Sequence, residues 1–99
     1  ISVKQAQEMQ QQGAVIIDVR TEAEYLQSHA KGAIHLGRDF LEFKIDKHVS
    51  DDSKVLMIMC GGGQRSLFAA ESLRELGYEV KNIEGGFRLW HENGLPVTV

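Results

Sequence analysis

The sequence predicts an α/β fold, a three-layer sandwich in which a mostly parallel central sheet carries helices on both faces. Three observations lead to this prediction. Short apolar runs typical of strands alternate along the chain with amphipathic segments typical of helices. The connections between these segments are short, as they are in α/β proteins with parallel sheets. No internal repeat, low-complexity tract or linker interrupts the chain, so we expect one domain over residues 1–99.

The first half of the chain is expected to alternate between helix and strand. Its predicted elements are, in order, a helix that follows Ser2 and ends near Gly13, a strand over 14–18 ("AVIID"), a helix that follows Thr21, a strand over 32–36 ("GAIHL") and a short helix over 39–49. The first two helices begin with capping boxes, in which a hydroxyl side chain is followed three positions later by Gln5 or Glu24. Both strands are predicted from their short apolar runs.

The strongest strand signal in the second half is the run 54–59 ("KVLMIM"), which we expect at the centre of the sheet and buried on both faces. The next helix has one apolar stripe and ends near Gly77, since glycine commonly follows the last helical turn. The stripe consists of Leu67, Ala70, Leu73 and Leu76. Residues 78–84 ("YEVKNIE") predict a further strand, and 85–94 ("GGFRLWHENG") predict the last helix.

Composition and charge argue against several classes of function. A hydrophobic fraction of 42% and a charged fraction of 25% are typical of a soluble globular chain. The net charge of −3 and the scattered Lys and Arg residues favour neither a nucleic-acid partner nor a membrane partner. A single cysteine excludes a disulfide scaffold and favours a reducing compartment, so we expect a cytoplasmic protein. The chain starts at Ile1, which leaves room for an upstream segment that has been removed.

The single cysteine, Cys60, lies where ligands bind in an open parallel sheet, at the carboxyl end of a strand. Three glycines, 61–63, follow it and would allow backbone N–H groups to close around its sulfur. The N-terminus of the next helix adds a partial positive charge. Such surroundings favour a nucleophilic thiolate that can carry an anionic adduct. A lone cysteine after an apolar strand is also commonly a small buried apolar residue, and this segment alone supports both interpretations equally.

Three segments in the right order resemble the signatures of the rhodanese-like sulfurtransferases. The segment "CGGGQRS" is similar to that family's six-residue loop, which would run from Cys60 to Arg65. The segment "IIDVRTEAEYLQSHAKGAIHL" is similar to its first signature and "IEGGFRLWHENGLPV" to its closing one, so the resemblance extends from Ile16 to Val97. Two departures are the turn "AKG" at 30–32, where Ile-Pro-Gly is common, and the absence of any side chain at 61–63.

The resemblance implies a rhodanese-like fold and a sulfurtransferase in which Cys60 is the catalytic nucleophile and carries sulfur as a persulfide. The implied substrates are a small anionic sulfur donor such as thiosulfate and a thiol acceptor, or a sulfur-relay protein in their place. No metal or organic cofactor is required. The substrate-binding residues would be those of the loop, namely Gly61, Gly62, Gly63, Gln64, Arg65 and Ser66. Because the glycines offer little side-chain recognition, they favour a larger persulfide donor or a protein partner over thiosulfate.

Two other classes of function remain as alternatives. A non-enzymatic module of the same fold usually lacks the cysteine, whereas Cys60 is present here. Cysteine phosphatases share the fold, but their loop has five residues between the cysteine and the arginine. Only four residues, 61–64, intervene in this chain. The shorter spacing predicts a tighter ring, suited to one sulfur atom rather than to a phosphate.

Arg65 has two interpretations. Its guanidinium would either bind an anionic substrate or pair with a carboxylate and brace the loop, and we expect the second role. Asp18 and Glu84 are the candidate carboxylates, because both lie near predicted strand ends. Asp18 and Arg20 are expected to be structural, with Arg20 able to reach Glu24 on the following helical turn.

The remaining polar and aromatic residues of interest are expected to have structural roles. Ser66 should cap the helix that follows it rather than act as a nucleophile. His29 should be a hydrogen-bonding turn residue, and the other histidines should lie on the surface. No pair of histidines has the spacing of metal ligands, so we expect no metal site. Phe87 and Trp90 should pack a helix face onto the sheet.

Overall fold

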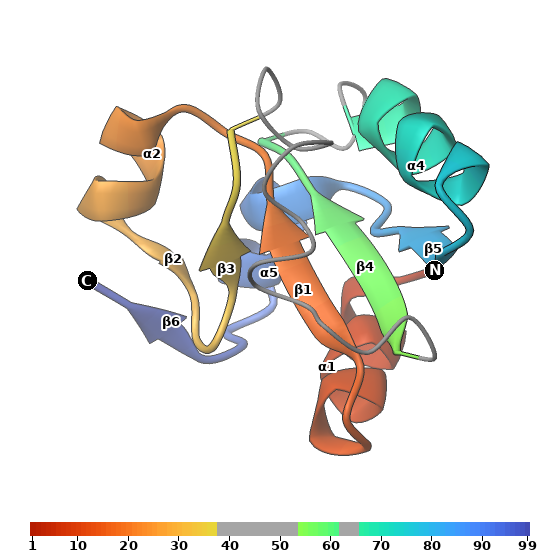
Figure 1. Ribbon diagram of the computed structural model, residues 1–99. Helices are drawn as coiled ribbons and strands as arrows, with labels where there is room; N and C mark the ends of the chain where they lie inside the picture. The colour runs from red at the N-terminus through yellow and green to blue at the C-terminus, as the bar shows by residue number, and fades with distance from the viewer. Residues whose placement is uncertain (38–53, 62–65) are drawn as a thin grey trace.

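A four-stranded parallel sheet forms the middle of the molecule (Figure 1). The computed structural model describes residues 1–37, 54–61 and 66–99, and within 66–69 only the course of the backbone. The elements are α1 (Val3–Gln11), β1 (Val15–Asp18), α2 (Glu22–Gln27), β2 (His29–Ala30), β3 (Ile34–His35), β4 (Val55–Met59), α4 (Ser66–Glu75), β5 (Glu79–Asn82), α5 (Gly86–Glu92) and β6 (Val97–Thr98).

The strands follow the order β3-β1-β4-β5, which places β4 between two neighbours, as its apolar sequence predicted. All three pairings are parallel, so the predicted parallel sheet is confirmed. Asp18 at the end of β1 is paired with Met59 at the end of β4 and with His35 at the end of β3. The carboxyl ends of these three strands therefore meet at one edge of the sheet, where ligands bind in such folds.

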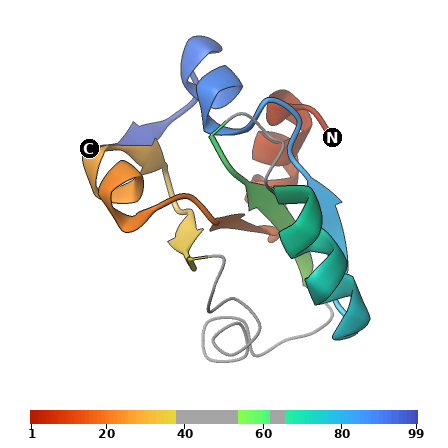
Figure 2. The ribbon, with the colours of Figure 1, turned by 90° about the horizontal axis from the view of Figure 1, so that it is seen from above.

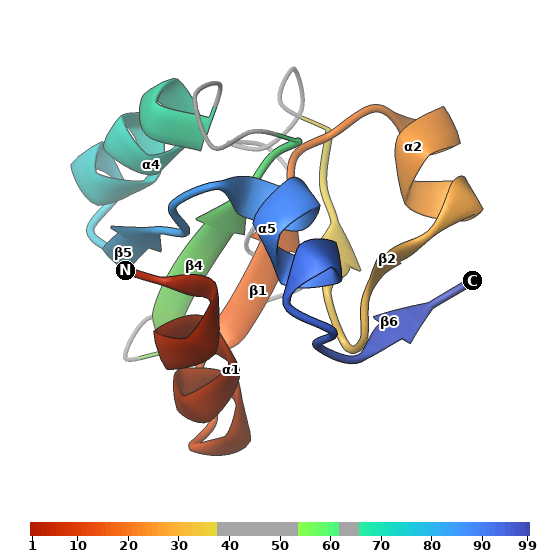
Figure 3. The same cartoon turned by 180° about the vertical axis from the view of Figure 1, so that it is seen from behind.

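Helices cover both faces of the sheet, which confirms the predicted three layers. α4 packs on one face against β4 and β5, whereas α1 and α5 lie together on the other face (Figures 2 and 3). Side chains of β4 alternate between the two sides. Leu56 and Ile58 belong to the apolar cluster beneath α4, and Met57 and Met59 belong to the cluster beneath α1 and α5. All four are fully buried, so β4 is covered on both faces as expected.

The helix boundaries that were predicted from capping patterns are confirmed. The Ser2 hydroxyl accepts a hydrogen bond from the backbone N–H of Gln5, and the Gln5 side chain accepts one from the backbone of Ser2. Thr21 and Glu24 exchange the same pair of bonds at the start of α2. α4 ends just before Gly77, which adopts a left-handed φ of 99°. These local signals act within a few residues, which is why the sequence alone reveals them.

Several details differ from the predictions. Leu76 lies beyond the end of α4 and is 53% exposed, so the apolar stripe ends at Leu73. α4 is described from Ser66 onward, and the predicted capping role of the Ser66 side chain lies outside the described residues. β2 and β6 pair antiparallel in a second, two-stranded sheet that was not predicted, because two-residue strands carry no readable alternation. The helix predicted over 39–49 lies outside the described residues.

Candidate active site

Cys60 follows β4 directly, at the edge where the strands end, as the sequence predicted. Its side chain continues the alternation of β4 and lies in the apolar cluster beneath α4, with Ile17, Val19 and Leu36 among its members. The residue is only 1% exposed. The thiol is thus at the expected edge of the sheet but enclosed, in a position that excludes bulk water.

The backbone that follows Cys60 is held by the first turn of α5. The N–H of Phe87 donates a hydrogen bond of 2.7 Å to the carbonyl of Cys60, and the N–H of Arg88 donates one of 3.0 Å to the carbonyl of Gly61. In a trans peptide the carbonyl and the next N–H point to opposite sides. The N–H of Gly61 therefore points away from α5, and α5 lies on the face of the sheet opposite to the Cys60 side chain.

Two consecutive glycines bring the chain into α5 at this point. Gly85 and Gly86 both adopt left-handed conformations, with φ of 77° and 55°. A Cβ atom on Gly85 would come within 2.9 Å of the Cβ of Leu89 and closer still to the end of that side chain. Glycine is therefore required by backbone conformation and by space. This requirement explains the "GG" that opens the closing signature.

The remaining residues of the predicted substrate loop lie outside the described part of the chain, namely Gly62, Gly63, Gln64 and Arg65, together with the side chain of Ser66. The two carboxylates expected near Arg65, those of Asp18 and Glu84, are both described. Glu84 is exposed. Asp18 is fully buried and bonded to Arg20 on both carboxylate oxygens. Asp18 is therefore the partner of Arg20, and the pairing of Arg65 lies outside the described residues.

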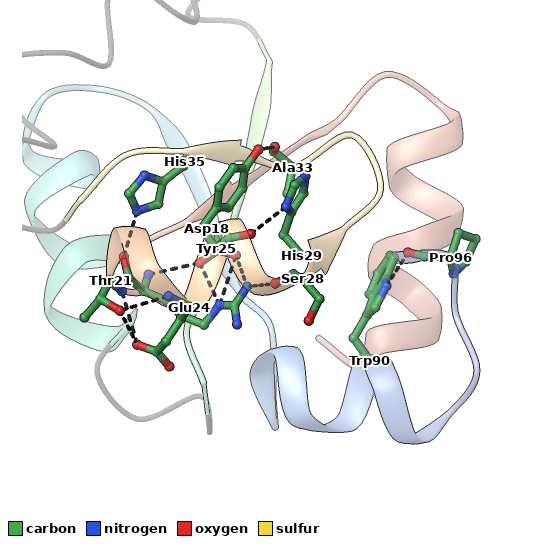
Figure 4. A network of polar contacts seen from close by, with 11 residues as sticks. Asp18, Thr21, Glu24, Tyr25, Ser28, His29, Ala33, His35, Trp90 and Pro96 are labelled. Atoms are coloured by element: carbon green, nitrogen blue, oxygen red, sulfur yellow. Dashed lines mark hydrogen bonds and ion pairs between the residues drawn. The ribbon is translucent and has the colours of Figure 1, made fainter. Parts of the chain in front are cut away.

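Asp18 and Arg20 form a buried ion pair at the end of β1 (Figure 4). Arg20 Nε lies 3.0 Å from both carboxylate oxygens of Asp18, and Nη2 lies 2.8 Å from Oδ2. The same Nη2 donates a 2.7 Å hydrogen bond to the carbonyl of Ser28, which ties the end of β1 to the end of α2. The expected partner Glu24 instead binds the hydroxyl of Thr21 in the capping box. A buried guanidinium requires a buried carboxylate, and that requirement selects Asp18.

The guanidinium of Arg20 also lies over the ring of Phe87, with its carbon 4.2 Å from the ring centroid. This distance is typical of a cation–π contact. The contact joins the end of β1 to the first turn of α5. Sequence reasoning missed it because no short-range pattern relates two residues so far apart in the chain. Trp90, by contrast, is fully buried in the cluster beneath α1 and α5, as predicted.

Three aromatic rings form a stack beside this ion pair. Tyr25 lies between His29 and His35, with ring centroids 3.7 Å and 4.8 Å away (Figure 4). His29 bonds the carbonyl of Tyr25, which confirms a hydrogen-bonding role, although His29 lies in β2 rather than in a turn. His35 Nε2 lies 2.8 Å from the carbonyl of Arg20 and must be the donor. The prediction of a surface role for His35 was wrong, because the parallel pairing of β3 with β1 brings it inward.

Stability should depend on pH above 10 through Tyr25. Burial, and next the negative charge of Asp18, raise the pKa of the Tyr25 phenol above its ordinary value of 10.0. A group whose pKa is raised on folding stabilises the protein fully below the unfolded pKa and loses that contribution as the pH rises through the folded pKa. The phenol also donates a 2.7 Å hydrogen bond to the carbonyl of Ala33. The difference in the free energy of unfolding between wild type and Tyr25→Phe should therefore be constant from pH 8 to pH 10 and become smaller at higher pH.

Urea unfolding followed by circular dichroism at each pH measures this difference. Tyr25→Phe is the matched variant, because it keeps the stacked ring and removes only the titrating hydroxyl. All other groups titrate equally in the two proteins. A difference that stays constant beyond pH 10 would contradict the prediction.

A shallow groove of about 380 Å³ lies between α2 and α5. Its lining residues are Arg20, Glu24, Gln27, Ser28, Phe87, Arg88, His91 and Glu92. The groove mixes both signs of charge and lies on the α5 side of the sheet, away from the Cys60 side chain. Within the described residues, no group of three or more His, Cys, Asp or Glu side chains is arranged to hold a metal ion. None of the helices described is long and apolar enough to cross a membrane.

The fold and the site together define an α/β domain with a cysteine loop at the carboxyl edge of its parallel sheet. The family model of the rhodanese-like domain matches residues 2–93, and the chain belongs to this family. A relative from Haemophilus influenzae (strain PittEE), "Thiosulfate sulfurtransferase GlpE", is 38% identical over 99 residues, covering 98% of this chain and 91% of the relative. The resemblance of the three sequence segments is thereby confirmed.

Solved structures of the same fold agree with this assignment. A rhodanese-related protein from Thermoplasma volcanium superposes with a TM-score of 0.87 at 28% identity, over 99% of this chain and 95% of that one. Reduced Bacillus anthracis CoADR-RHD gives a TM-score of 0.81 at 34% identity, over 91% of this chain but only 16% of that longer one. RPA3614 from Rhodopseudomonas palustris, described as a protein of unknown function and possible tyrosine phosphatase, gives 0.85 at 30% identity, over 98% of this chain and 82% of that one.

Proposed function

We propose that the protein is a sulfurtransferase that moves sulfane sulfur from thiosulfate or a persulfide to a thiol acceptor, with Cys60 as the nucleophile. The observation that supports this most is the place of the single cysteine, directly after the central strand at the edge where β1, β3 and β4 end. The curated relative at 38% identity is named a thiosulfate sulfurtransferase, which supports the same reaction for this chain. We place the reaction in the cytoplasm, where a single thiol stays reduced.

The proposed reaction has two displacement steps and no net change of oxidation state. The Cys60 thiolate attacks the outer sulfur of thiosulfate, the S–S bond breaks, and sulfite leaves with its electron pair. Cys60 then carries a persulfide. An acceptor thiolate attacks the terminal sulfur, becomes a persulfide itself and restores the Cys60 thiolate. Covalent relay of this kind divides one difficult transfer into two easier steps.

The surroundings of Cys60 support a small donor. With 1% of the residue exposed, the thiol is enclosed by apolar side chains, which would shelter a persulfide from water. The glycine-rich loop had favoured a bulky donor, whereas enclosure favours thiosulfate. We assign substrate binding to residues 61–66, and the N–H of Gly61, turned away from α5, is one described donor that could meet a sulfur anion. A sulfur-relay protein stays an alternative donor or acceptor.

Intact-mass spectrometry tests this proposal directly. After incubation with thiosulfate and removal of excess donor, the protein should be heavier by one sulfur atom, and peptide fragmentation should place that atom on Cys60. Cyanide or a small thiol should then restore the original mass. The same measurement is made with a polysulfide donor. A mass gain with polysulfide alone would show that thiosulfate is not the donor, whereas no gain with either would show that the reaction itself is wrong.

Two outcomes would overturn the proposal. One is the absence of any mass gain with both thiosulfate and polysulfide. The other is hydrolysis of an aryl phosphate that depends on Cys60, which would favour the phosphatase alternative despite the four-residue spacing between Cys60 and Arg65.

A further inference from the structure

We propose that Arg20 is a positioning residue for the cysteine loop, and that it acts through Phe87 and the first turn of α5. This inference rests on the proposed function, since it explains how the chain places Cys60 for sulfur transfer. Among the described residues, the side chain of Arg20 forms hydrogen bonds with Asp18 and with the carbonyl of Ser28. Its effect passes from the ion pair to an aromatic ring, and from there to two backbone hydrogen bonds.

The first link is the fixed orientation of the guanidinium. Arg20 is 5% exposed, and Asp18 holds it by two carboxylate oxygens while its own backbone N–H also bonds Asp18. The carbonyl of Ser28 adds a further bond on Nη2. A planar guanidinium held in this way has little rotational freedom. It therefore presents a flat face in a defined direction.

The second link is the contact between that face and Phe87. The guanidinium carbon lies 4.2 Å above the ring centroid, and the ring packs against the apolar cluster beneath α1 and α5. Phe87 therefore contacts both Arg20 and this cluster. Because the two glycines before it have no side chains, this ring is the first side chain of α5 to contact other elements.

The third link is the pair of hydrogen bonds from the start of α5 to the cysteine loop. The N–H groups of Phe87 and Arg88 hold the carbonyls of Cys60 and Gly61. These bonds set the peptide plane directly after the nucleophile and hence the direction of the Gly61 N–H. An error of about 1 Å in the placement of reacting groups can cost roughly 100-fold in rate. A loosened α5 should thus slow the reaction without contact between Arg20 and substrate.

Phe87→Leu tests the contact between Arg20 and Phe87 without changing any charge. Leucine keeps an apolar side chain for the cluster but removes the aromatic face, whereas Phe87→Tyr keeps the ring and is the conservative rescue. The stability control is Val15→Ala, at the amino end of β1, which removes apolar volume packed against the cluster beneath α4 at the end of the sheet opposite to Cys60. Two measurements are made: the rate of sulfur loading of Cys60 as a function of thiosulfate concentration, and amide hydrogen exchange by NMR.

Phe87→Leu should lower the maximal loading rate by about 10-fold while the half-saturating thiosulfate concentration changes little, because the ring positions the nucleophile and does not bind the donor. Exchange of the Phe87 and Arg88 amides should quicken relative to that of Met57 in β4, since only the helix start is loosened. Phe87→Tyr should stay within about twofold of wild type in both measurements. Val15→Ala should leave the relative exchange of these amides and the loading rate unchanged.

Equal behaviour of the leucine and tyrosine variants in loading and in exchange would overturn the inference, as would slow loading in Val15→Ala. The exchange measurement does not require sulfur transfer. If wild type takes no sulfur from any donor, the proposed function fails. The exchange of the Phe87 and Arg88 amides relative to that of Met57 then still tests whether the contact between Arg20 and Phe87 holds the backbone after Cys60.

Discussion

Cys60→Ala should abolish sulfur transfer, with a fall in turnover of at least about 10⁴-fold to the uncatalysed background. The reason is chemical, because no other thiol exists in the chain to accept the sulfur. Alanine is the informative replacement. Cys60 is 1% exposed, and alanine removes the sulfur without placing a new polar group at this buried position. Alanine removes one sulfur atom from a well-packed site and should leave the fold intact.

The measurement is a steady-state assay of thiocyanate formation from thiosulfate and cyanide, with the two substrate concentrations varied independently. Wild type should give the parallel-line pattern of a covalent ping-pong mechanism. Met57→Leu is the matched control, since it conserves volume on the same strand but on the opposite face, and it should retain activity. Residual turnover in Cys60→Ala above a few per cent of wild type would exclude Cys60 as the sulfur carrier.

Asp18→Ala should lower the free energy of unfolding by about 3–5 kcal/mol, because it leaves the Arg20 guanidinium buried without a counter-charge. Asp18 is fully buried and Arg20 is 5% exposed, so water cannot replace the lost carboxylate. Such a loss is a large fraction of the roughly 5–15 kcal/mol that stabilises a typical domain. Urea unfolding at neutral pH, followed by circular dichroism and tryptophan fluorescence, measures the effect.

The double variant Asp18→Ala/Arg20→Met should be much less destabilised than the sum of its two single variants, since it removes the unpaired charge. Glu92→Ala provides an exposed comparison. Glu92 pairs with Arg88 over 3.5 Å, and both side chains are more than half exposed, so this loss should cost no more than about 1 kcal/mol. Equal effects of Asp18→Ala and Glu92→Ala would show that burial of the first pair has no energetic consequence.

Three segments that are distant in the sequence meet at the carboxyl edge of the sheet. They are the end of β1 with its ion pair, the end of β4 with Cys60, and the start of α5. Parallel pairing of β1 with β4 brings the first two together, and the two left-handed glycines before α5 deliver the third. The arrangement gives one reason why all three signature segments occur together in one chain: each supports the backbone or side chains of the next.

The local features were readable from the sequence because their causes are local. Capping boxes at Ser2 and Thr21 depend on residues three positions apart, and the left-handed glycine at 77 depends on backbone sterics. The continuous apolar run of β4 predicted burial on both faces of the sheet, and such burial requires helices on both sides. The place of Cys60 at the strand end follows from the same run, and so does the resemblance to the rhodanese-like family.

The partners of polar side chains could not be predicted in this way. Sequence spacing indicated Glu24 as a partner of Arg20, whereas the structure pairs Arg20 with Asp18, and the contact of Arg20 with Phe87 depends on the docking of α5. His35 was expected on the surface but is drawn inward by the pairing of β3 with β1, and the two-residue strands β2 and β6 carried no signal. The structure also shows that Cys60 is enclosed, which the sequence did not reveal.

The sequence by itself thus determined the order of the main elements, the parallel sheet, the family and the position of the single cysteine along the chain. These follow from short-range patterns of apolar, capping and glycine residues, whose energetic consequences act within one element. Only the tertiary structure decided which buried charges pair, which ring covers Arg20 and how α5 holds the backbone after Cys60. Those contacts join residues from different elements, and a buried charge or an unpaired carbonyl selects its partner only after the elements have packed.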